Sequence, residues 1–253
     1  MVKIILHGCN GRMGQVISEL AKADEHLTVV AGVDPYDDGH NDYPVYPSLE
    51  ACEVKADVVV DFSNPSGTED MLEQCIRKKL PLVLCTTGLK DDQLEKVMEA
   101  SSKIALLRSA NMSLGVNLLM ELLGKAATVL AEEGFDIEIV EKHHRHKLDA
   151  PSGTAIALAD TINEALDQKF VYETNRAAKR EERPNDVIGI SAVRGGTITG
   201  EHEVIFAGMD EVISFTHTAY SRDIFGKGAL AAAKFLAGKK PGLYNMSDVI
   251  KAK

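Results

Sequence analysis

The stretch that decides the fold is VKIILHGCNGRMG, residues 2–14. A short apolar run ends at His7, glycines follow with the spacing GxxGxxG, and apolar residues then recur at helical spacing over residues 12–23. A strand, a glycine turn and a helix start in this order are typical of a dinucleotide-binding domain. The glycines allow a pyrophosphate to approach the backbone, and the helix start supplies N–H groups and the positive end of its dipole. A glycine-rich turn without a ligand is the alternative.

The following segments repeat the alternation of strand and helix. Further apolar runs lie at residues 27–33, 57–62, 82–85 and 104–107, and helical patterns lie at residues 68–79 and 91–101. This order predicts an α/β fold with a doubly wound, Rossmann-type parallel sheet that helices cover on both faces. Asp34 stands at the end of the second run, where an acid accepts hydrogen bonds from an adenosine ribose.

The pattern changes after Ser113 and predicts a second domain of α+β type with a mixed sheet. Helical patterns lie at residues 114–133 and 153–166, and β-rich runs lie at residues 135–141, 187–193, 198–206 and 212–218. Residues 168–186 are polar and charged and predict a mobile loop. A last helix, residues 223–237, is expected to pack back on the first domain. We therefore expect a dinucleotide-binding domain of residues 1–113 and 223–253, and a second domain of residues 114–222.

Composition excludes several classes of function. The 253 residues carry a formal net charge of −10, so nucleic acid and anionic membranes are not expected partners. The four cysteines form no CxxC pair, and the first residues run directly into the strand without the apolar segment of a signal peptide. We expect reduced thiols and a cytoplasmic protein.

A basic, histidine-rich segment follows the first strand of the second domain. KHHRHK, residues 142–147, places three permanent positive charges and three imidazoles in an acidic protein, and a solvated loop is its ordinary interpretation. The sequence DAPSGT, residues 149–154, then predicts a helix start with Ser152 as the N-cap and with N–H groups at Gly153 and Thr154. Together they predict a site for a small dianion, with a lysine or a histidine as proton donor.

A zinc site is the competing interpretation of the three histidines. In an extended segment His143 and His144 point to opposite faces, and the neighbouring lysine and arginine repel a cation, so no metal is expected. By the same alternation His143 shares a face with Ile137 and Ile139, which makes a core histidine its alternative role. Two polar clusters at carboxyl ends of strands, Cys85 to Gly88 and Ala110 to Ser113, are candidate ligand contacts, with ordinary turns as the alternative.

Five motifs together resemble the bacterial 4-hydroxy-tetrahydrodipicolinate reductase family, also called dihydrodipicolinate reductase. They are GCNGRMG at residues 8–14, TTG at 86–88, SANMSLGVN at 109–117, EKHHRHKLDAPSGTA at 141–155 and VRGGTITGEHEVIF at 193–206. The resemblance implies a two-domain enzyme, usually a homotetramer, of lysine and diaminopimelate biosynthesis, in which residues 114–222 form the substrate-binding and oligomerisation domain. Such an enzyme reduces a cyclic dicarboxylate imine with NADH or NADPH.

The resemblance also assigns residues. It implies His143 and Lys147 as catalytic residues, and His144, Gly153 and Thr154 as substrate-binding residues, to which the N-cap argument adds Ser152. The implied cofactor contacts are Gly8, Cys9, Asn10, Gly11, Arg12, Met13, Asp34, Cys85, Thr86, Thr87, Ala110, Asn111, Met112 and Ser113. Two positions depart from the family pattern: Pro35 follows Asp34 where several members have an arginine, and Cys85 replaces a frequent glycine. The sequence does not decide whether His143 or Lys147 delivers the proton.

The segment after the second strand bears on the cofactor. Residues 34–42 contain four acids, Asp34, Asp37, Asp38 and Asp42, and no lysine or arginine. A 2′-phosphate is repelled there, so NADH is the preferred cofactor, with NADPH possible through Arg12. The alternatives to the reductase are a homoserine or semialdehyde dehydrogenase, for which Cys85 is the one candidate nucleophile, and a non-catalytic dinucleotide sensor.

Overall fold

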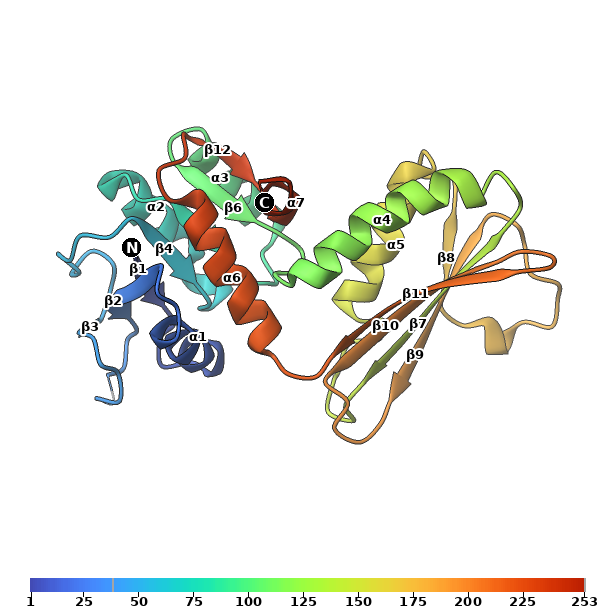
Figure 1. Cartoon of the computed structure of the whole chain (residues 1–253), viewed down its shortest axis with the longest axis horizontal. Helices are drawn as coiled ribbons and strands as arrows, with labels where there is room; N and C mark the ends of the chain where they lie inside the picture. The colour runs from blue at the N-terminus through green and yellow to red at the C-terminus, as the bar shows by residue number, and fades with distance from the viewer. Residues whose placement is uncertain (38, 253) are drawn as a thin grey trace. The chain divides into compact units, whose positions relative to one another are not determined.

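The structure is a computed structural model that describes residues 1–37 and 39–252. It divides into two compact units, which we call unit 1 (Met1–Leu114 and Arg222–Lys253) and unit 2 (Gly115–Ser221). Each border lies one residue from the expected one. Unit 1 is thus built from two separate lengths of chain, and unit 2 lies between them in the sequence (Figure 1).

Unit 1 contains a parallel sheet in the order β12-β6-β5-β4-β1-β2-β3. Its strands are β1 (Val2–His7), β2 (Leu27–Val33), β3 (Val45–Tyr46), β4 (Val58–Asp61), β5 (Leu82–Leu84), β6 (Ala105–Arg108) and β12 (Gly242–Tyr244). The strand order reverses at β1: the chain adds β2 and β3 on one side of β1 and then β4, β5, β6 and β12 on the other side. Open α/β sheets bind ligands at the carboxyl ends of the strands beside such a point.

Helices cover both faces of this sheet, which confirms the doubly wound fold. One face packs against α1 (Arg12–Lys22), α6 (Asp223–Leu236) and α7 (Met246–Lys251), and the other against α2 (Thr68–Lys78) and α3 (Asp91–Ser101). In β1, Ile4 and Leu6 belong to the first core and Ile5 to the second. Because successive side chains of a strand point to opposite faces, a continuous apolar run serves both cores.

Unit 2 contains a mixed sheet in the order β11-β10-β7-β9-β8, as expected. The strands are β7 (Asp136–His143), β8 (Val171–Glu173), β9 (Val187–Arg194), β10 (Gly200–Ala207) and β11 (Val212–Ala219). The helices α4 (Leu114–Leu130) and α5 (Gly153–Ala165) pack on one face of the sheet (Figure 1). Side chains of β7 are therefore alternately buried and partly exposed.

The prediction of a mobile loop at residues 168–186 was wrong for part of the segment. Residues 171–173 form β8 beside β9, and Arg176–Ala178 form a short 3-10 helix. Arg183 holds the rest through hydrogen bonds to Asp136, at 2.6 Å, and Glu138, at 2.8 Å, and to the carbonyls of Ile137 and Val187. Arg183 orders this part of the segment through polar contacts with distant strands. Such contacts produce no apolar periodicity, so the sequence pattern did not predict them.

Candidate active site

The glycine turn, residues 8–14, connects β1 to α1 with a backbone that only glycines permit. Gly8 has φ +79°, and a Cβ on Gly14 would lie 2.3 Å from the Gly8 carbonyl oxygen. Helix α1 begins without a side-chain cap and without an acidic residue in its first turn. Its N–H groups and positive dipole end therefore face a site that suits an anion.

The acidic segment after β2 is attached to this turn. The Asp34 carboxylate accepts hydrogen bonds from the N–H groups of Asn10 and Tyr36, both at 3.2 Å. Asn41 donates to the Asn10 side chain at 2.6 Å, and Asn10 donates to the Tyr36 carbonyl. Asp34 is thus held beside the glycine turn, whereas Asp38 lies outside the described residues. Arg12, the first residue of α1, is exposed.

A cavity of about 310 Å³, which we call the strand-end cavity, lies at the carboxyl ends of the strands in unit 1. It is lined by Met13, Phe62, Cys85, Thr87, Ser109, Ala110, Asn111, Met112 and Phe225. Six of these are predicted cofactor contacts, and the sequence analysis missed Phe62, Ser109 and Phe225. Thr86 and Ser113 were predicted as contacts but do not line the cavity, and both are buried.

Two thiols near the glycine turn and the cavity are poor nucleophiles. Burial raises the pKa of Cys9 to about 11 and raises the pKa of Cys85 well above its usual value. Both remain protonated at neutral pH, and a thiol is far less reactive than a thiolate. This chemistry argues against a semialdehyde dehydrogenase with Cys85 as its nucleophile.

Beneath the cavity lies a buried polar cluster, which we call the Asp61 cluster and define as His7, Asp61 and Thr86. Asp61 has no exposed surface, and its carboxylate accepts hydrogen bonds from His7 Nδ1 and Thr86 Oγ1, each at 2.6 Å, and from the Ser63 N–H at 3.1 Å. Burial alone raises the pKa of Asp61. The hydrogen bonds outweigh it, so the pKa is lower than usual and the carboxylate is ionised.

The corresponding buried carboxylate of unit 2 is Glu141, on the covered face of β7. It accepts hydrogen bonds from His143 Nδ1 at 2.6 Å, from two nitrogens of Arg194 at 2.6 and 2.7 Å, and from the Ser152 N–H at 2.9 Å. These donors outweigh burial and lower the pKa of Glu141. Glu141 therefore joins the end of β7, the end of β9 and the start of α5.

These contacts determine the state of His143. An ionised Glu141 can only accept, so Nδ1 of His143 carries the proton and, in the neutral ring, Nε2 is free to accept. Burial lowers the pKa of His143 despite the carboxylate beside it. The His202 ring packs edge-on at 5.1 Å between centroids, and burial lowers its pKa from 6.5 to about 4. Both rings are mainly neutral at pH 7.

The remaining predicted residues lie around this group. Lys147 forms an ion pair with Asp149 at 2.9 Å, and the Asp149 carbonyl accepts a hydrogen bond from Arg194 at 2.6 Å. Ser152 is buried; its hydroxyl caps α5 through the Ala155 N–H and contacts His202 at 2.9 Å. Gly153, in contrast, is exposed at the helix start. Nδ1 of the half-buried His144 has no hydrogen-bond partner among the described residues.

Comparison with known proteins adds to this geometry. A family model described as Dihydrodipicolinate reductase, N-terminus, matches residues 2–112, and one described as Dihydrodipicolinate reductase, C-terminus, matches residues 115–250. The chain belongs to the dihydrodipicolinate reductase family. This membership confirms the expected family. It also confirms that the protein is an oxidoreductase of lysine and diaminopimelate biosynthesis.

Similar proteins cover the whole chain. A 4-hydroxy-tetrahydrodipicolinate reductase of Caldanaerobacter subterraneus subsp. tengcongensis is 53% identical over 99% of both chains, and one of Clostridium novyi is 47% identical over 100% of both. The solved structure of a dipicolinate-bound dihydrodipicolinate reductase from Paenisporosarcina sp. TG-14 is 25% identical, covers 97% of both chains and has a TM-score of 0.81.

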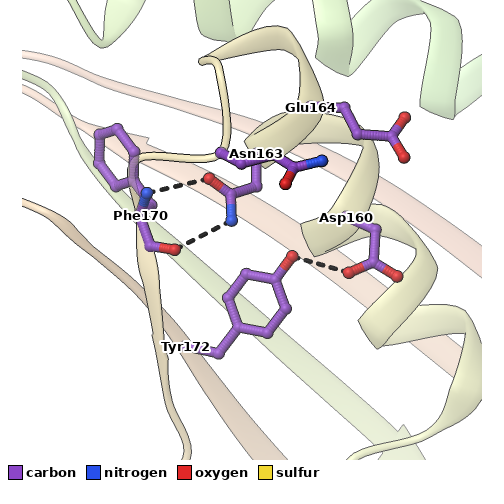
Figure 2. Close-up of a pocket in the computed structure, with 6 residues that line it drawn as sticks. Asp160, Asn163, Glu164, Phe170 and Tyr172 are labelled. Atoms are coloured by element: carbon purple, nitrogen blue, oxygen red, sulfur yellow. Dashed lines mark hydrogen bonds between the residues drawn. The ribbon is translucent and has the colours of Figure 1, made fainter.

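This member of the reductase family has a second pocket, in unit 2, whose lining differs chemically from that of the strand-end cavity. The pocket of about 350 Å³ between α5 and β8 is lined by Asp160, Asn163, Glu164, Gln168, Phe170 and Tyr172. In Figure 2, Tyr172 donates to Asp160, and Asn163 bonds to both backbone groups of Phe170. Its acidic lining does not suit a dicarboxylate, and none of its residues was predicted for the site.

Sequence reasoning missed three residues of the unit 2 site, namely Glu141, Arg194 and His202. A signal was present for Glu141, because it is a charged residue at a core-facing position of an alternating strand. Arg194 and His202 reach the site through strand pairing across more than fifty residues. Among the described residues, no group of three or more His, Cys, Asp or Glu side chains could hold a metal ion. None of the helices in the described part of the chain has the length and apolar character needed to cross a membrane.

Proposed function

We propose that unit 1 binds NAD(P)H with its pyrophosphate at the glycine turn, its ribose at Asp34 and its nicotinamide in the strand-end cavity. The uncapped start of α1 suits the pyrophosphate charge, and the cavity, with Met13, Phe62 and Phe225, offers flat apolar contacts to a ring. When bound, the reduced dinucleotide supplies a hydride. The side chains of unit 1 bind and orient it.

The substrate in this proposal is 4-hydroxy-tetrahydrodipicolinate, which the enzyme reduces to tetrahydrodipicolinate. One observation carries the assignment: hydrogen bonds and ion pairs link Lys147, Asp149, Arg194 and Glu141 to His143 and to the start of α5. Cationic groups and a helix start suit two carboxylates. His144, Gly153 and Thr154 are the proposed contacts, and we assign the buried Ser152 to holding the helix start.

Reduction of the ring also needs a proton, and we assign it to the Lys147 ammonium. Neutral His143 keeps its proton on Nδ1 toward Glu141, so its Nε2 accepts a hydrogen bond and does not donate one. In this assignment His143 orients the substrate and Lys147 is the general acid. Lys147→Ala is expected to lower kcat by about 10²–10⁴-fold while NADH binds as in wild type. Wild-type kcat in that variant would return the role to His143.

We further propose that NADH is preferred over NADPH. Asp34 lies beside the glycine turn, and residues 34–42 contain no lysine or arginine; Lys22 forms an ion pair with Asp42 at the end of this segment, and Arg12 is exposed in the turn. Repulsion of a 2′-phosphate by the acids of this segment amounts to about 1–3 kcal/mol, a roughly ten- to hundredfold preference. The ratio of kcat/KM for the two cofactors at equal ionic strength tests it, and a ratio near one would contradict it.

We also propose a cytoplasmic homotetramer. One face of the unit 2 sheet carries the helices, and exposed apolar side chains such as Val193 and Val212 lie on its strands. Such side chains suit contacts between copies. Analytical ultracentrifugation at micromolar concentration tests the assembly, and a monomer there would contradict it.

One assay separates this function from its alternatives. Freshly prepared dihydrodipicolinate precursor is added to the protein with NADH, and the loss of absorbance at the NADH band is followed. Turnover is expected. A dinucleotide sensor would bind NADH without turnover, and a homoserine or semialdehyde dehydrogenase would act on its own substrate and not on this one.

A further inference from the structure

The Asp61 cluster joins three segments at the edge of the unit 1 sheet. His7 ends β1, Asp61 ends β4, and Thr86 follows β5, so the cluster lies at the carboxyl ends of the strands, beside the point where the strand order reverses. Each Asp61 oxygen is used, one by His7 and the Ser63 N–H and the other by Thr86. The Asp61 carbonyl also accepts the Cys85 N–H at 3.0 Å.

The fold does not need a charged group at this position. The rest of β4, Val58 to Val60, is fully buried and apolar. Buried ion pairs cost desolvation free energy, and apolar side chains of similar size in their place commonly give equal or greater stability. What the cluster supplies is a fixed spacing of three chain segments, which apolar contacts define less sharply.

Two of these segments, those that follow β4 and β5, line the strand-end cavity, and the third, at Gly8, packs closely against the first of them. Gly8 follows His7, Phe62 follows Asp61, and Thr87 follows Thr86. Phe62, Cys85 and Thr87 line the cavity, and the Phe62 carbonyl oxygen lies 2.8 Å from the point where a Cβ on Gly8 would stand. A shift at Asp61 therefore reaches the cavity wall directly.

We propose that Thr86 and Asp61 are positioning residues for the nicotinamide half of the cofactor. Thr86 acts through its hydroxyl on Asp61, because its side chain is buried and bonded inward, while Thr87 and Phe62 contact the ring. The adenosine half binds at Asp34 and the glycine turn, so it depends less on the cluster. The proposal rests on the proposed function only in taking the ligand to be a nicotinamide dinucleotide.

The test compares two ligands on matched variants. Thr86→Val removes the hydroxyl at nearly constant shape, and the Kd values of NADH and of ADP-ribose, which lacks the nicotinamide, are measured by calorimetry without substrate. The NADH Kd is expected to rise roughly three- to tenfold, because Thr87 and Phe62 are then no longer held in place before the ring binds and must be ordered on binding. The ADP-ribose Kd is expected to stay at its wild-type value. Thr86→Ser restores the hydroxyl and is expected to bind NADH as wild type does.

Thr68→Val is the matched control. Thr68 is fully buried at the start of α2, and its hydroxyl has no hydrogen-bond partner among the described residues. It undergoes the same chemical change as Thr86 in the same unit but lies outside the cluster and the cavity lining. Wild-type Kd values for both ligands are expected.

Two results would overturn the proposal. They are wild-type NADH binding by Thr86→Val, and equal losses of NADH and ADP-ribose, which would show that the cluster supports the whole unit. If Thr86→Val does not fold, Thr86→Ala carries the same comparison, since it also removes the hydroxyl. Wild-type protein that binds neither ligand would overturn the proposed cofactor together with this proposal, whereas the first two results leave the cofactor standing.

Discussion

Asp61 and Glu141 show how single buried carboxylates define the two candidate binding regions. Each accepts a 2.6 Å hydrogen bond from Nδ1 of a histidine and bonds to further segments of chain. In the sequence Asp61 is one acid at the end of an apolar run, and Glu141 is one of three acids in an alternating strand. The neighbours VVV and EIV predict strands correctly, but which donors will reach an acid depends on strands that are distant in sequence.

Gly200 is a residue whose missing side chain bears on the site. A Cβ at this buried position of β10 would lie 3.1 Å from His143 Nε2, tighter than ordinary contact. Gly200→Ala is expected to displace the His143 ring and to lower kcat by about ten- to hundredfold, because small misplacements in active sites have effects of this size. The measurement is steady-state turnover, with the KM for NADH unchanged.

Gly124→Ala is the matched control for this substitution. Gly124 lies on α4 in the same unit, and a Cβ there meets only a Thr161 methyl group at 3.9 Å. Turnover is expected to stay at the wild-type value, and the helix gains up to about 1 kcal/mol. If Gly200→Ala and Gly124→Ala had equal turnover, the position of His143 would not matter to the reaction.

His202 gives the protein a defined loss of stability in mild acid. Burial lowers its pKa from 6.5 to about 4 in the folded state, so as the pH falls the unfolded chain takes up this proton first. This destabilising contribution to the free energy of unfolding begins near pH 6.5 and grows as the pH falls to about 4. Between pH 7 and pH 5 it lowers the free energy of unfolding by about 2 kcal/mol. Urea unfolding at the two pH values measures it.

The control for this pH dependence is another histidine. His202→Asn removes the titrating ring, so the loss of stability from pH 7 to pH 5 is expected to shrink by about the same 2 kcal/mol. His26 is exposed, and His26→Asn is expected to keep the wild-type pH dependence. An unchanged loss in His202→Asn would assign the pH dependence to other groups.

At the level of elements, the long periodic segments and the short buried strands were predictable, and the short strands at the sheet edges were not. The helices α1 to α6 and the central strands of both sheets follow from apolar spacing, since each must cover or form part of one of the three cores. β3, β8 and β12 contain two or three residues each and exist because a neighbouring strand offers a free edge. Such strands carry no periodicity of their own.

Arg183 is expected to be the residue that orders the segment between α5 and β9. Arg183→Met removes hydrogen bonds to two carboxylates and three carbonyls, which are the contacts that tie this segment to β7 and β9. The free energy of unfolding should fall by about 2–4 kcal/mol, and limited proteolysis should cut residues 168–186 faster. Arg180→Met, at an exposed position of the same segment, is the control. Equal cleavage of the two variants would contradict this role.

For the whole molecule, the decisive feature is that unit 1 needs both lengths of its chain. The core beneath its sheet includes Ala229, Ala233 and Leu236 of α6, and Met246 and Val249 of α7. A chain ending at Ser221 loses this entire cover. We expect it to bind neither NADH nor ADP-ribose and to expose apolar surface to a dye such as ANS.

The control for truncation keeps the cover and omits the other unit. Residues 1–114 joined to residues 222–253 by a glycine-serine linker retain every residue of that core. Cooperative unfolding and ADP-ribose binding are expected. Binding of ADP-ribose by the chain that ends at Ser221 would show that the first length folds without α6.

The discontinuity of unit 1 has a consequence for synthesis on the ribosome. After Leu114 has been made, residues 115–221 must be translated before α6 appears. At about 5–20 residues per second this interval lasts on the order of 5–20 s, during which one face of the nascent sheet has α1 but lacks α6 and α7. Unit 2 is complete first, although it begins later. The nascent chain therefore presents a face rich in valine and leucine to chaperones until its last residues emerge.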